Sequence, residues 1–246
     1  MCINFRPAAN SAFLAERLGP LEPPLGHLED VFPGYQAHVA LRRGAAGDSL
    51  AALRPAQFGL VPHWCNDAAQ ARDISRKTYN ARSETAASKP SFRTAWAARQ
   101  WVLVPMDCFF EPCWEDAPAH GGRPVRWRIA RADGAPFAVA GLWDRWADPA
   151  TGQVQGSFTV LTVNADGHAV MGRMHRPDEE KRMPAIVPPE RYADWLQATP
   201  QTAMGFLQAA PAEWLQAQAD PLPGTPPRAH TCLLYTSDAA DERSSV

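Results

Sequence analysis

The second residue of the chain, Cys2, combines two nucleophiles once the initiator methionine is removed. The reference pKa is about 7.7–8.0 for an α-amine and about 8.5 for a cysteine thiol, so modest tuning makes both groups reactive near neutral pH. The amine of such a 1,2-aminothiol condenses with an aldehyde to an imine, and the thiolate then closes on the imine carbon to give a thiazolidine ring. A frayed or buried N-terminus is the ordinary alternative for a cysteine at this position.

A single carboxylate, Glu111, interrupts an apolar and aromatic segment at 108–112 (CFFEP). Two phenylalanines precede it, and Pro112 and Trp114 follow it, so we expect its carboxyl group to be partly desolvated. Burial disfavours the charged form and would raise the pKa of Glu111 toward the range useful for proton transfer. The alternative is a surface glutamate at the end of a strand.

Four other polar or aromatic side chains each allow two interpretations. Asn80 either orients a reactive group or caps a turn. His175, one of seven histidines, either moves protons or occupies an ordinary surface or core position. Arg182 is either a phosphate clamp or one side of a loop salt bridge. Trp64 either stacks on a nucleobase or covers the core.

Positive charge gathers between residues 76 and 99, although the formal net charge of the chain is −2. Against one acid, Glu84, this stretch has the basic residues Arg76, Lys77, Arg82, Lys89, Arg93 and Arg99. Such a run either lines a groove that follows phosphates or forms a solvated helix face.

The composition is that of an ordinary soluble globular protein, with 246 residues, 46% hydrophobic and 20% charged. No apolar run reaches 18 residues and the N-terminus does not resemble a secretory signal, so we expect no membrane partner and a cytoplasmic location. The five cysteines are odd in number and form no CxxC pair. We therefore expect no disulfide framework, metal or cofactor, and we expect buried thiols at Cys65, Cys108 and Cys113.

The elements that would position these residues are mainly strands in the middle of the chain. We expect strands at 38–41, 58–62, 100–105, 108–111, 125–130, 137–143 and 158–163, with a hairpin at residues 132–134. Helical spacing occurs at 83–98, interrupted at Pro90, and helices are expected at 189–197 and 200–208. This pattern predicts an α+β fold with a mostly antiparallel sheet.

We expect one domain over residues 2–222, because no Pro-rich linker divides it. The tail at 223–246 is expected to be disordered. From about residue 231, including Cys232, it resembles translated read-through rather than native protein and is left out of the fold.

Several segments occur in an order that resembles the SOS-response-associated peptidase (SRAP) family, whose members are known as abasic-site processing proteins. Besides Cys2 they are FGLVPHW at 58–64, YNARSET at 79–85, SFRTAW at 91–96, LVPMDCFFEP at 103–112, AGLWDRW at 140–146, FTVLTVNAD at 158–166 and MHRPDEEKRMPAIV at 174–187. The resemblance runs to about residue 200. Its specific part is the combination of Cys2, Asn-Ala-Arg-x-Glu and a downstream histidine before Arg-Met-Pro.

The resemblance implies a barrel-like core with flanking helices, and a covalent reaction with DNA. The N-terminal cysteine would crosslink to the C1′ aldehyde of an abasic site in single-stranded DNA, and the thiazolidine would shield the lesion. Cys2 would be the nucleophile, Asn80 would hydrogen-bond the adduct, Glu111 would move protons at the amine, and His175 would assist ring opening and proton transfer.

The DNA contacts implied by the resemblance begin with Arg82, which matches the family's phosphate-contacting arginine. Trp64 would be a stacking wedge, and Lys77, Arg182 and Arg6 would add basic contacts. The partner is single-stranded DNA with abasic sites, and the protein is expected to be a monomer. A lyase activity and removal of Met1 also belong to this expectation. The sequence leaves open whether the protein or a methionine aminopeptidase removes Met1.

The chain departs from the family pattern directly after the cysteine. Many members continue with Gly-Arg, where this chain has Ile3-Asn4, and Arg6 is the candidate replacement for the missing arginine.

A second departure concerns the histidine, which commonly stands two residues before Arg-Met-Pro, where this chain has Glu180. His175 lies seven residues before Arg182. We expect a five-residue loop insertion that keeps His175 in the site, with His168 as the fallback.

Two other functions remain open. An N-terminal-nucleophile amidohydrolase would also unmask a cysteine, and would hydrolyse an amide without forming a DNA adduct. A non-catalytic single-stranded-DNA-binding module would bind in a salt-sensitive way, whether or not the DNA contains an abasic site.

Overall fold

The computed structural model describes residues 4–19, 30–42, 51–115 and 117–222. Five strands close into a barrel. In barrel order they are β7 (Phe137–Ala147), β8 (Val154–Asn164), β3 (Ala51–Phe58), β2 (Gln36–Arg42) and β5 (Trp101–Cys113), which pairs again with β7. Closure lets neighbouring strands satisfy each other's backbone hydrogen-bonding groups, so the barrel is a rigid frame.

Within the described part of the chain, six further strands extend the barrel into one eleven-stranded sheet. β1 (Asn4–Pro7) and β6 (Val125–Arg131) pair with β5, and β11 (Leu215–Ala219) pairs with β6. β4 (Asn80–Arg82) and β9 (Arg182–Pro184) pair with the end of β8, and β10 (Ile186–Val187) pairs with β7. Among the described pairings, β3–β8 and β4–β8 are parallel and the others are antiparallel.

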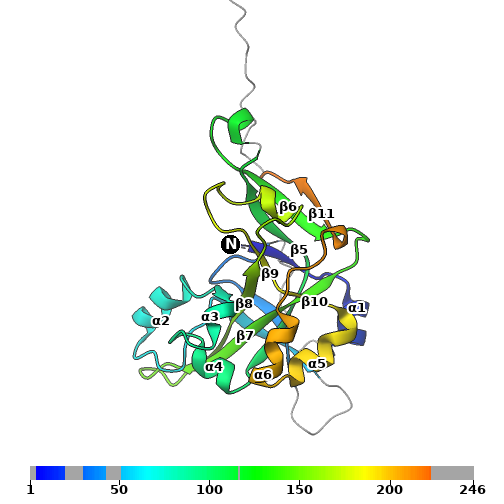
Figure 1. Ribbon diagram of the computed structural model, residues 1–246. Helices are drawn as coiled ribbons and strands as arrows, with labels where there is room; N and C mark the ends of the chain where they lie inside the picture. The colour runs from blue at the N-terminus through cyan, green and yellow to red at the C-terminus, as the bar shows by residue number, and fades with distance from the viewer. Residues whose placement is uncertain (1–3, 20–29, 43–50, 116, 223–246) are drawn as a thin grey trace, which may run out of the picture.

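Short helices surround the barrel, mostly in the lower half of Figure 1. They are α1 (Ser11–Leu18), α2 (Ala68–Ser75), α3 (Ser83–Ala86), α4 (Arg93–Ala97), α5 (Tyr192–Gln197) and α6 (Pro200–Ala203). Single 3-10 turns lie at Ala117–His120, Met171–Arg173, Pro189–Arg191, Met204–Phe206 and Ala212–Trp214. The longest described helices, α1 and α2, have eight residues each, and no described helix is both long and apolar enough to cross a bilayer.

Aromatic side chains fill the barrel and attach the helices to it. Phe58 and Phe158, on the parallel pair β3 and β8, stack with ring centroids 5.2 Å apart. Outside the barrel, the ring centroids of Trp195 of α5 and Trp101 of β5 are 5.0 Å apart. The Trp195 indole Nε1 donates to the Val102 carbonyl at 2.9 Å. Burial of rings this large stabilises the helix–barrel contact by both apolar area and a satisfied N–H group.

The α+β class and the mostly antiparallel, barrel-like core expected from the sequence are confirmed. The three thiols Cys65, Cys108 and Cys113 are buried, as expected. The two strands expected at 100–105 and 108–111 are one continuous strand, β5, which runs through Pro105. Helices α1 and α2 and strand β11 were not expected, because each is short and only weakly patterned.

The hairpin expected at residues 132–134 is wrong. A turn does lie there, since the Gly134 N–H donates to the Arg131 carbonyl at 3.1 Å. The strands on either side, β6 and β7, nevertheless pair with successive stretches of β5, Phe109–Cys113 and Trp101–Met106, instead of with each other. A turn signal reports a local reversal of the chain and does not determine which strand becomes the partner.

The strand expected at 58–62 is also wrong, because β3 ends at Phe58. Gly59 follows with a φ of +106°, a conformation that favours glycine, and a Cβ there would lie 2.4 Å from the Ser75 carbonyl oxygen. The chain therefore turns against the end of α2 and sends the segment with Trp64 out of the sheet.

Candidate active site

Glu111 and His175 form a hydrogen-bonded pair at the end of β5, with His175 Nε2 2.9 Å from Glu111 Oε2. Glu111 lies on β5 opposite Trp127 of β6, and β1 begins opposite the preceding residue of β5, Phe110. His175 follows the 3-10 turn Met171–Arg173, and its backbone N–H donates to the Pro112 carbonyl at 2.9 Å. The barrel strand and the returning loop together place a carboxyl group against an imidazole.

The pair is almost removed from solvent, with exposed side-chain fractions of 0% for Glu111 and 4% for His175. Burial raises the pKa of Glu111 to about 7. Burial also lowers the pKa of His175 to about 4, and the nearby Lys181 ammonium contributes in the same direction. Near neutral pH a substantial fraction of the molecules therefore has a protonated carboxyl beside a neutral imidazole, a proton donor next to a base. Of the two interpretations of Glu111, the buried one holds, and His175 is buried as well.

These opposite shifts predict how the free energy of unfolding depends on pH. Because the pKa of Glu111 rises from 4.5 to about 7 on folding, this group alone makes stability fall as pH rises through that window. The pKa of His175 falls from 6.5 to about 4, so this group alone makes stability rise with pH between those values. In the wild type the two slopes oppose each other between about pH 4.5 and pH 6.5.

Glu111→Gln is expected to leave the histidine slope unopposed, so that stability rises with pH by up to about 1.4 kcal/mol per pH unit in that range. His175→Gln is expected to show the reverse slope. Urea unfolding at several pH values measures both, with the exposed Glu115→Gln as the control. Equal slopes in the wild type and Glu111→Gln would contradict the assignment.

The loop after His175 is braced by Lys181. The Lys181 ammonium donates to the carbonyls of His175, at 3.3 Å, and Arg176, and the Lys181 backbone N–H donates to the Asp166 carboxylate at 2.8 Å. His175 itself has a φ of +58°, in the left-handed region that few residues other than glycine adopt. The bracing holds the imidazole in position despite this backbone conformation.

His168, the fallback histidine, has another role. Its Nδ1 accepts from the backbone N–H groups of Val170 and Met171, both at 3.1 Å, and its Nε2 lies 2.9 Å from the Ala210 carbonyl. Both ring nitrogens are thus used in holding the loop, and it is His175 that the structure places on Glu111.

A second group, here called the Arg182 cluster, consists of Arg82, Glu84, Glu180 and Arg182. Two short strands pair with the last residues of β8: β4 in parallel and β9 in antiparallel orientation. This pairing brings Arg82 of β4 and Arg182 of β9 together at the end of β8. Arg182 is 2% exposed and donates to Glu84 at 2.8 Å and to Glu180 at 2.5 Å. It also donates to the side chain and the carbonyl of Thr162, at 3.2 and 2.7 Å.

This arrangement corrects the expectation that Arg182 contacts DNA. Its guanidinium is buried and held by carboxylates and a carbonyl, so the salt bridge is the interpretation that the structure shows. Arg82 has the opposite character: its side chain is 51% exposed, and it reaches Glu180 at 2.6 Å from the solvent side.

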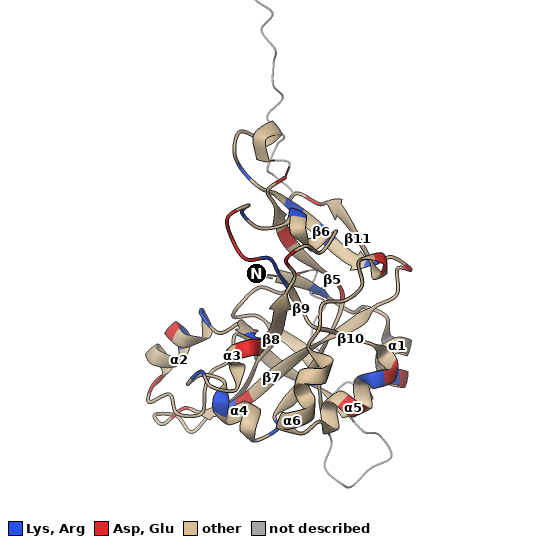
Figure 2. Ribbon diagram, in the orientation of Figure 1, with Lys and Arg blue, Asp and Glu red and all other residues tan. Residues whose placement is uncertain are grey.

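The other expected DNA contacts lie on the surface or are half-buried. Trp64 is 39% exposed, and its indole N–H donates to the Pro90 carbonyl at 3.3 Å. Lys77 is exposed just after α2. Asn80, which is expected to hydrogen-bond the adduct and not the DNA backbone, is half-buried at the start of β4. Arg6 of β1 is half-buried and pairs with Asp30 at 3.2 Å. Figure 2 shows Lys and Arg residues on several elements of the ribbon.

Cys2 lies outside the described residues. The first described strand, β1, begins at Asn4, which is in register with Phe110, the neighbour of Glu111 on β5. Cys232 and the tail from residue 223 are also outside the described residues, and the single domain over residues 2–222 stays a prediction.

The sequence did not identify Glu84 and Glu180 as site residues. The acidic run at 178–180 was visible, but its ionic partner Arg82 is far away along the chain. Two arginine–tryptophan contacts were also missed. Arg173 lies over the Trp127 ring at 4.6 Å, and Arg176 lies over the Trp114 ring at 5.1 Å, on the loop and strand ends next to Glu111.

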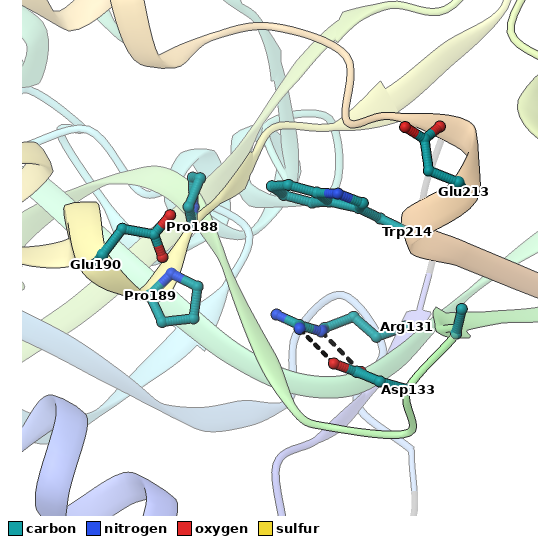
Figure 3. A pocket seen from close by; sticks show the side chains of 8 residues that line it. Arg131, Asp133, Pro188, Pro189, Glu190, Glu213 and Trp214 are labelled. Atoms are coloured by element: carbon teal, nitrogen blue, oxygen red, sulfur yellow. Dashed lines mark hydrogen bonds and ion pairs between the residues drawn. The ribbon is translucent and has the colours of Figure 1, made fainter.

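A separate pocket of about 410 Å³ lies between the end of β6 and the segments near Pro188 and Trp214. Figure 3 shows the Trp214 indole facing the Arg131–Asp133 ion pair across this pocket. None of its lining residues is among the residues expected at the site. Among the described residues, no group of three His, Cys, Asp or Glu side chains could hold a metal ion.

Comparison with known proteins gives a family and a fold. The family model described as SOS response associated peptidase (SRAP) matches residues 1–219. The abasic site processing protein YoqW of Bacillus subtilis is 28% identical over 164 residues, which are 65% of this chain and 66% of that protein. The abasic site processing protein HMCES of Xenopus tropicalis is 29% identical over 156 residues, which are 56% of this chain and 42% of that protein. The matches thus span about two thirds or less of these relatives.

Solved structures agree with the fold. A crystal structure of a protein from Bordetella bronchiseptica superposes with a TM-score of 0.79 at 32% identity, covering 90% of this chain and all of that one. A crystal structure from Bacteroides thetaiotaomicron has a TM-score of 0.75 at 23% identity, covering 89% of this chain and 91% of that one. The second likeness concerns the fold alone.

Proposed function

Because the chain belongs to the SOS response associated peptidase (SRAP) family, we propose that it acts on abasic sites in DNA by forming a covalent link through Cys2. The observation that supports this most is the buried Glu111–His175 pair at the end of β5. Relatives named abasic site processing proteins support the choice of lesion. An abasic sugar is the nucleotide that can present an aldehyde, so the chemistry itself distinguishes damaged from intact DNA.

The reaction needs a proton donor and a base close to the N-terminus. The Cys2 amine adds to the C1′ aldehyde carbon, and the carbinolamine loses its hydroxyl group as water to leave an imine. The thiolate then adds to the imine carbon, and the nitrogen takes up a proton, so the thiazolidine differs from its components by one water. The raised pKa of Glu111 suits it to protonate the leaving hydroxyl group. The neutral imidazole of His175 suits removal of a proton from the closed sugar as the ring opens.

Chain connectivity supports the placement of Cys2 in this reaction. One residue, Ile3, separates Cys2 from Asn4, whose register partner on β5 is Phe110, next to Glu111. In an extended chain the Cα atoms of residues 2 and 4 are about 7 Å apart. The reactive N-terminus therefore has Glu111 within its reach.

Single-stranded DNA is the proposed form of the substrate. An exposed tryptophan, Trp64, and exposed basic side chains such as Arg82 and Lys77 suit stacking and phosphate contacts without sequence preference. A monomer that works with DNA in the cytoplasm is part of the same proposal. So is β-elimination from the imine, a lyase reaction that competes with thiazolidine closure.

Intact-mass analysis after incubation with an abasic single-stranded oligonucleotide tests the proposal. The expected product has the mass of the protein without Met1 plus the oligonucleotide, less one water, and it survives denaturation by heat. Cys2→Ala is expected to abolish this product, whereas Cys232→Ala, a cysteine in the tail, is expected to retain it.

Three outcomes would count against the proposal. A chain that keeps Met1 yet forms the adduct would exclude the aminothiol. An equally heat-stable adduct with Cys2→Ser would exclude the thiazolidine. Amide hydrolysis without any DNA adduct would favour the N-terminal-nucleophile amidohydrolase.

A further inference from the structure

The exposed guanidinium of Arg82 is already occupied by a carboxylate of the same chain. Arg82 Nη1 lies 2.6 Å from Glu180 Oε2, and the Arg82 side chain is 51% exposed. A carboxylate at this distance provides the oxygen acceptor and the negative charge that a DNA phosphate would provide. Arg82 is also the residue to which the proposed function assigns a phosphate contact.

We propose that Glu180 determines specificity by standing in for a DNA phosphate on Arg82, so that single-stranded DNA has to displace it before Arg82 can bind the backbone. The inference rests on the proposed function, and it concerns how weakly intact DNA is held, not how the crosslink forms. The Arg82 contact contributes less binding free energy to intact DNA, because the existing ion pair with Glu180 must first be broken. An abasic strand is retained by its covalent bond, so the exchange affects its retention much less.

Glu180 is held in place from behind by Arg182. Its second oxygen, Oε1, accepts from Arg182 at 2.5 Å and from Asn164 at 3.2 Å, which leaves Oε2 directed at Arg82. Burial works to raise the pKa of Glu180, but the hydrogen bonds from Arg182 and Asn164 prevail and lower it. The carboxylate is therefore charged at neutral pH, and its position is fixed by a side chain that is itself 2% exposed.

The two arginines on Glu180 differ in how easily they can be exchanged. An exposed ion pair such as Arg82–Glu180 is worth about 0–1 kcal/mol, because water and salt screen it. The contact from Arg182 is shielded from water and persists. A phosphate can therefore replace Glu180 at Arg82 while the contacts of Arg182 remain in place. Glu180 thus weakens the binding of DNA at Arg82 but does not prevent it.

The loop around Glu180 adds negative charge at the same place. Asp178 and Glu179 precede it and are exposed. Figure 2 shows this acidic run on the loop that leads into β9. Like charges repel an approaching phosphate backbone, and they do so more strongly at low salt.

Binding of an intact single-stranded oligonucleotide, measured by fluorescence anisotropy over a range of salt concentrations, tests the inference. Glu180→Gln keeps an oxygen that can accept from Arg182 but removes the charge from Arg82. It is expected to bind about two- to fivefold more tightly than the wild type. Its dependence of log affinity on log salt is expected to steepen by about 0.7, the increment for one more phosphate contact on a single strand.

Matched variants separate the contact from the net charge. Glu179→Gln makes the same charge change on the same loop and is expected to give a smaller gain with an unchanged salt slope. Glu180→Asp keeps the charge beside Arg182 but shortens the side chain by one methylene, so it is expected to bind more tightly than the wild type at the same net charge. The double variant Arg82→Gln/Glu180→Gln is expected to bind intact DNA no more tightly than Arg82→Gln alone.

Each result decides the inference. Equal gains for Glu180→Gln and Glu179→Gln, or a gain that persists without Arg82, would overturn it, while crosslinking by the wild type would leave the proposed function intact. If no variant bound intact DNA and the wild type formed no adduct, the proposed function would fail together with the inference. Circular dichroism and urea unfolding of each variant verify that it is folded.

Discussion

Glu111→Gln is expected to slow adduct formation with abasic single-stranded DNA by about 100- to 10,000-fold, the usual contribution of a positioned general acid or base. Glutamine fits the same buried space and can still contact His175, but it cannot deliver a proton to the leaving hydroxyl group. Single-turnover adduct formation on denaturing gels measures the rate. Glu115→Gln, an exposed carboxylate four residues further along the chain, is the control and is expected to react like the wild type.

The rate of adduct formation is also expected to depend on pH through Glu111. Because the pKa of Glu111 is raised to about 7, its acid form is lost as pH rises through neutrality. We expect the wild-type rate to decline on the alkaline side of about pH 7, and this decline to be absent from the residual activity of Glu111→Gln. An undiminished rate in Glu111→Gln, or the same alkaline decline in that variant, would remove Glu111 from proton transfer.

Arg182→Ala is expected to lower the free energy of unfolding by about 3 kcal/mol, at the lower end of the range for breaking a buried ion pair. The variant loses the hydrogen bonds to Thr162, Glu84 and Glu180 and leaves a cavity below the end of β8. The loss stays at the lower end because both glutamates are partly exposed and can be hydrated after the change.

Arg82→Ala is the matched comparison, since Arg82 pairs with the same Glu180 but from the surface. It is expected to change stability by less than about 1 kcal/mol. Urea unfolding at one pH measures both variants. Similar losses for the two arginines would mean that the Arg182 cluster is not organised around the buried guanidinium.

Much of the fold could be predicted from local pattern. The apolar, β-rich segments that became β2, β5, β6, β7 and β8 are visible along the chain, and grouped strands with few helices indicate an antiparallel α+β protein. The partners of those strands could not be predicted. Residues 132–134 form a turn, yet the strands that flank it, β6 and β7, pair with successive stretches of β5 and not with each other.

For the site too, one part could be predicted from the sequence and another part could not. The sequence by itself determined which reactive groups are present: an aminothiol at Cys2 after loss of Met1, a carboxylate among aromatic residues at Glu111, and a basic stretch around Arg82. These are properties of side-chain type and immediate neighbours, so they can be read without coordinates.

Only the tertiary structure decided which of these groups meet. Glu111 and His175 are 64 residues apart along the chain and 2.9 Å apart in space. Arg182 and Arg82 looked alike in the sequence, but one is buried and the other is exposed, because β9 and β4 lie on the end of β8 in different ways. Burial and charge pairing depend on which distant segments pack together, and spacing along the chain contains no measure of that.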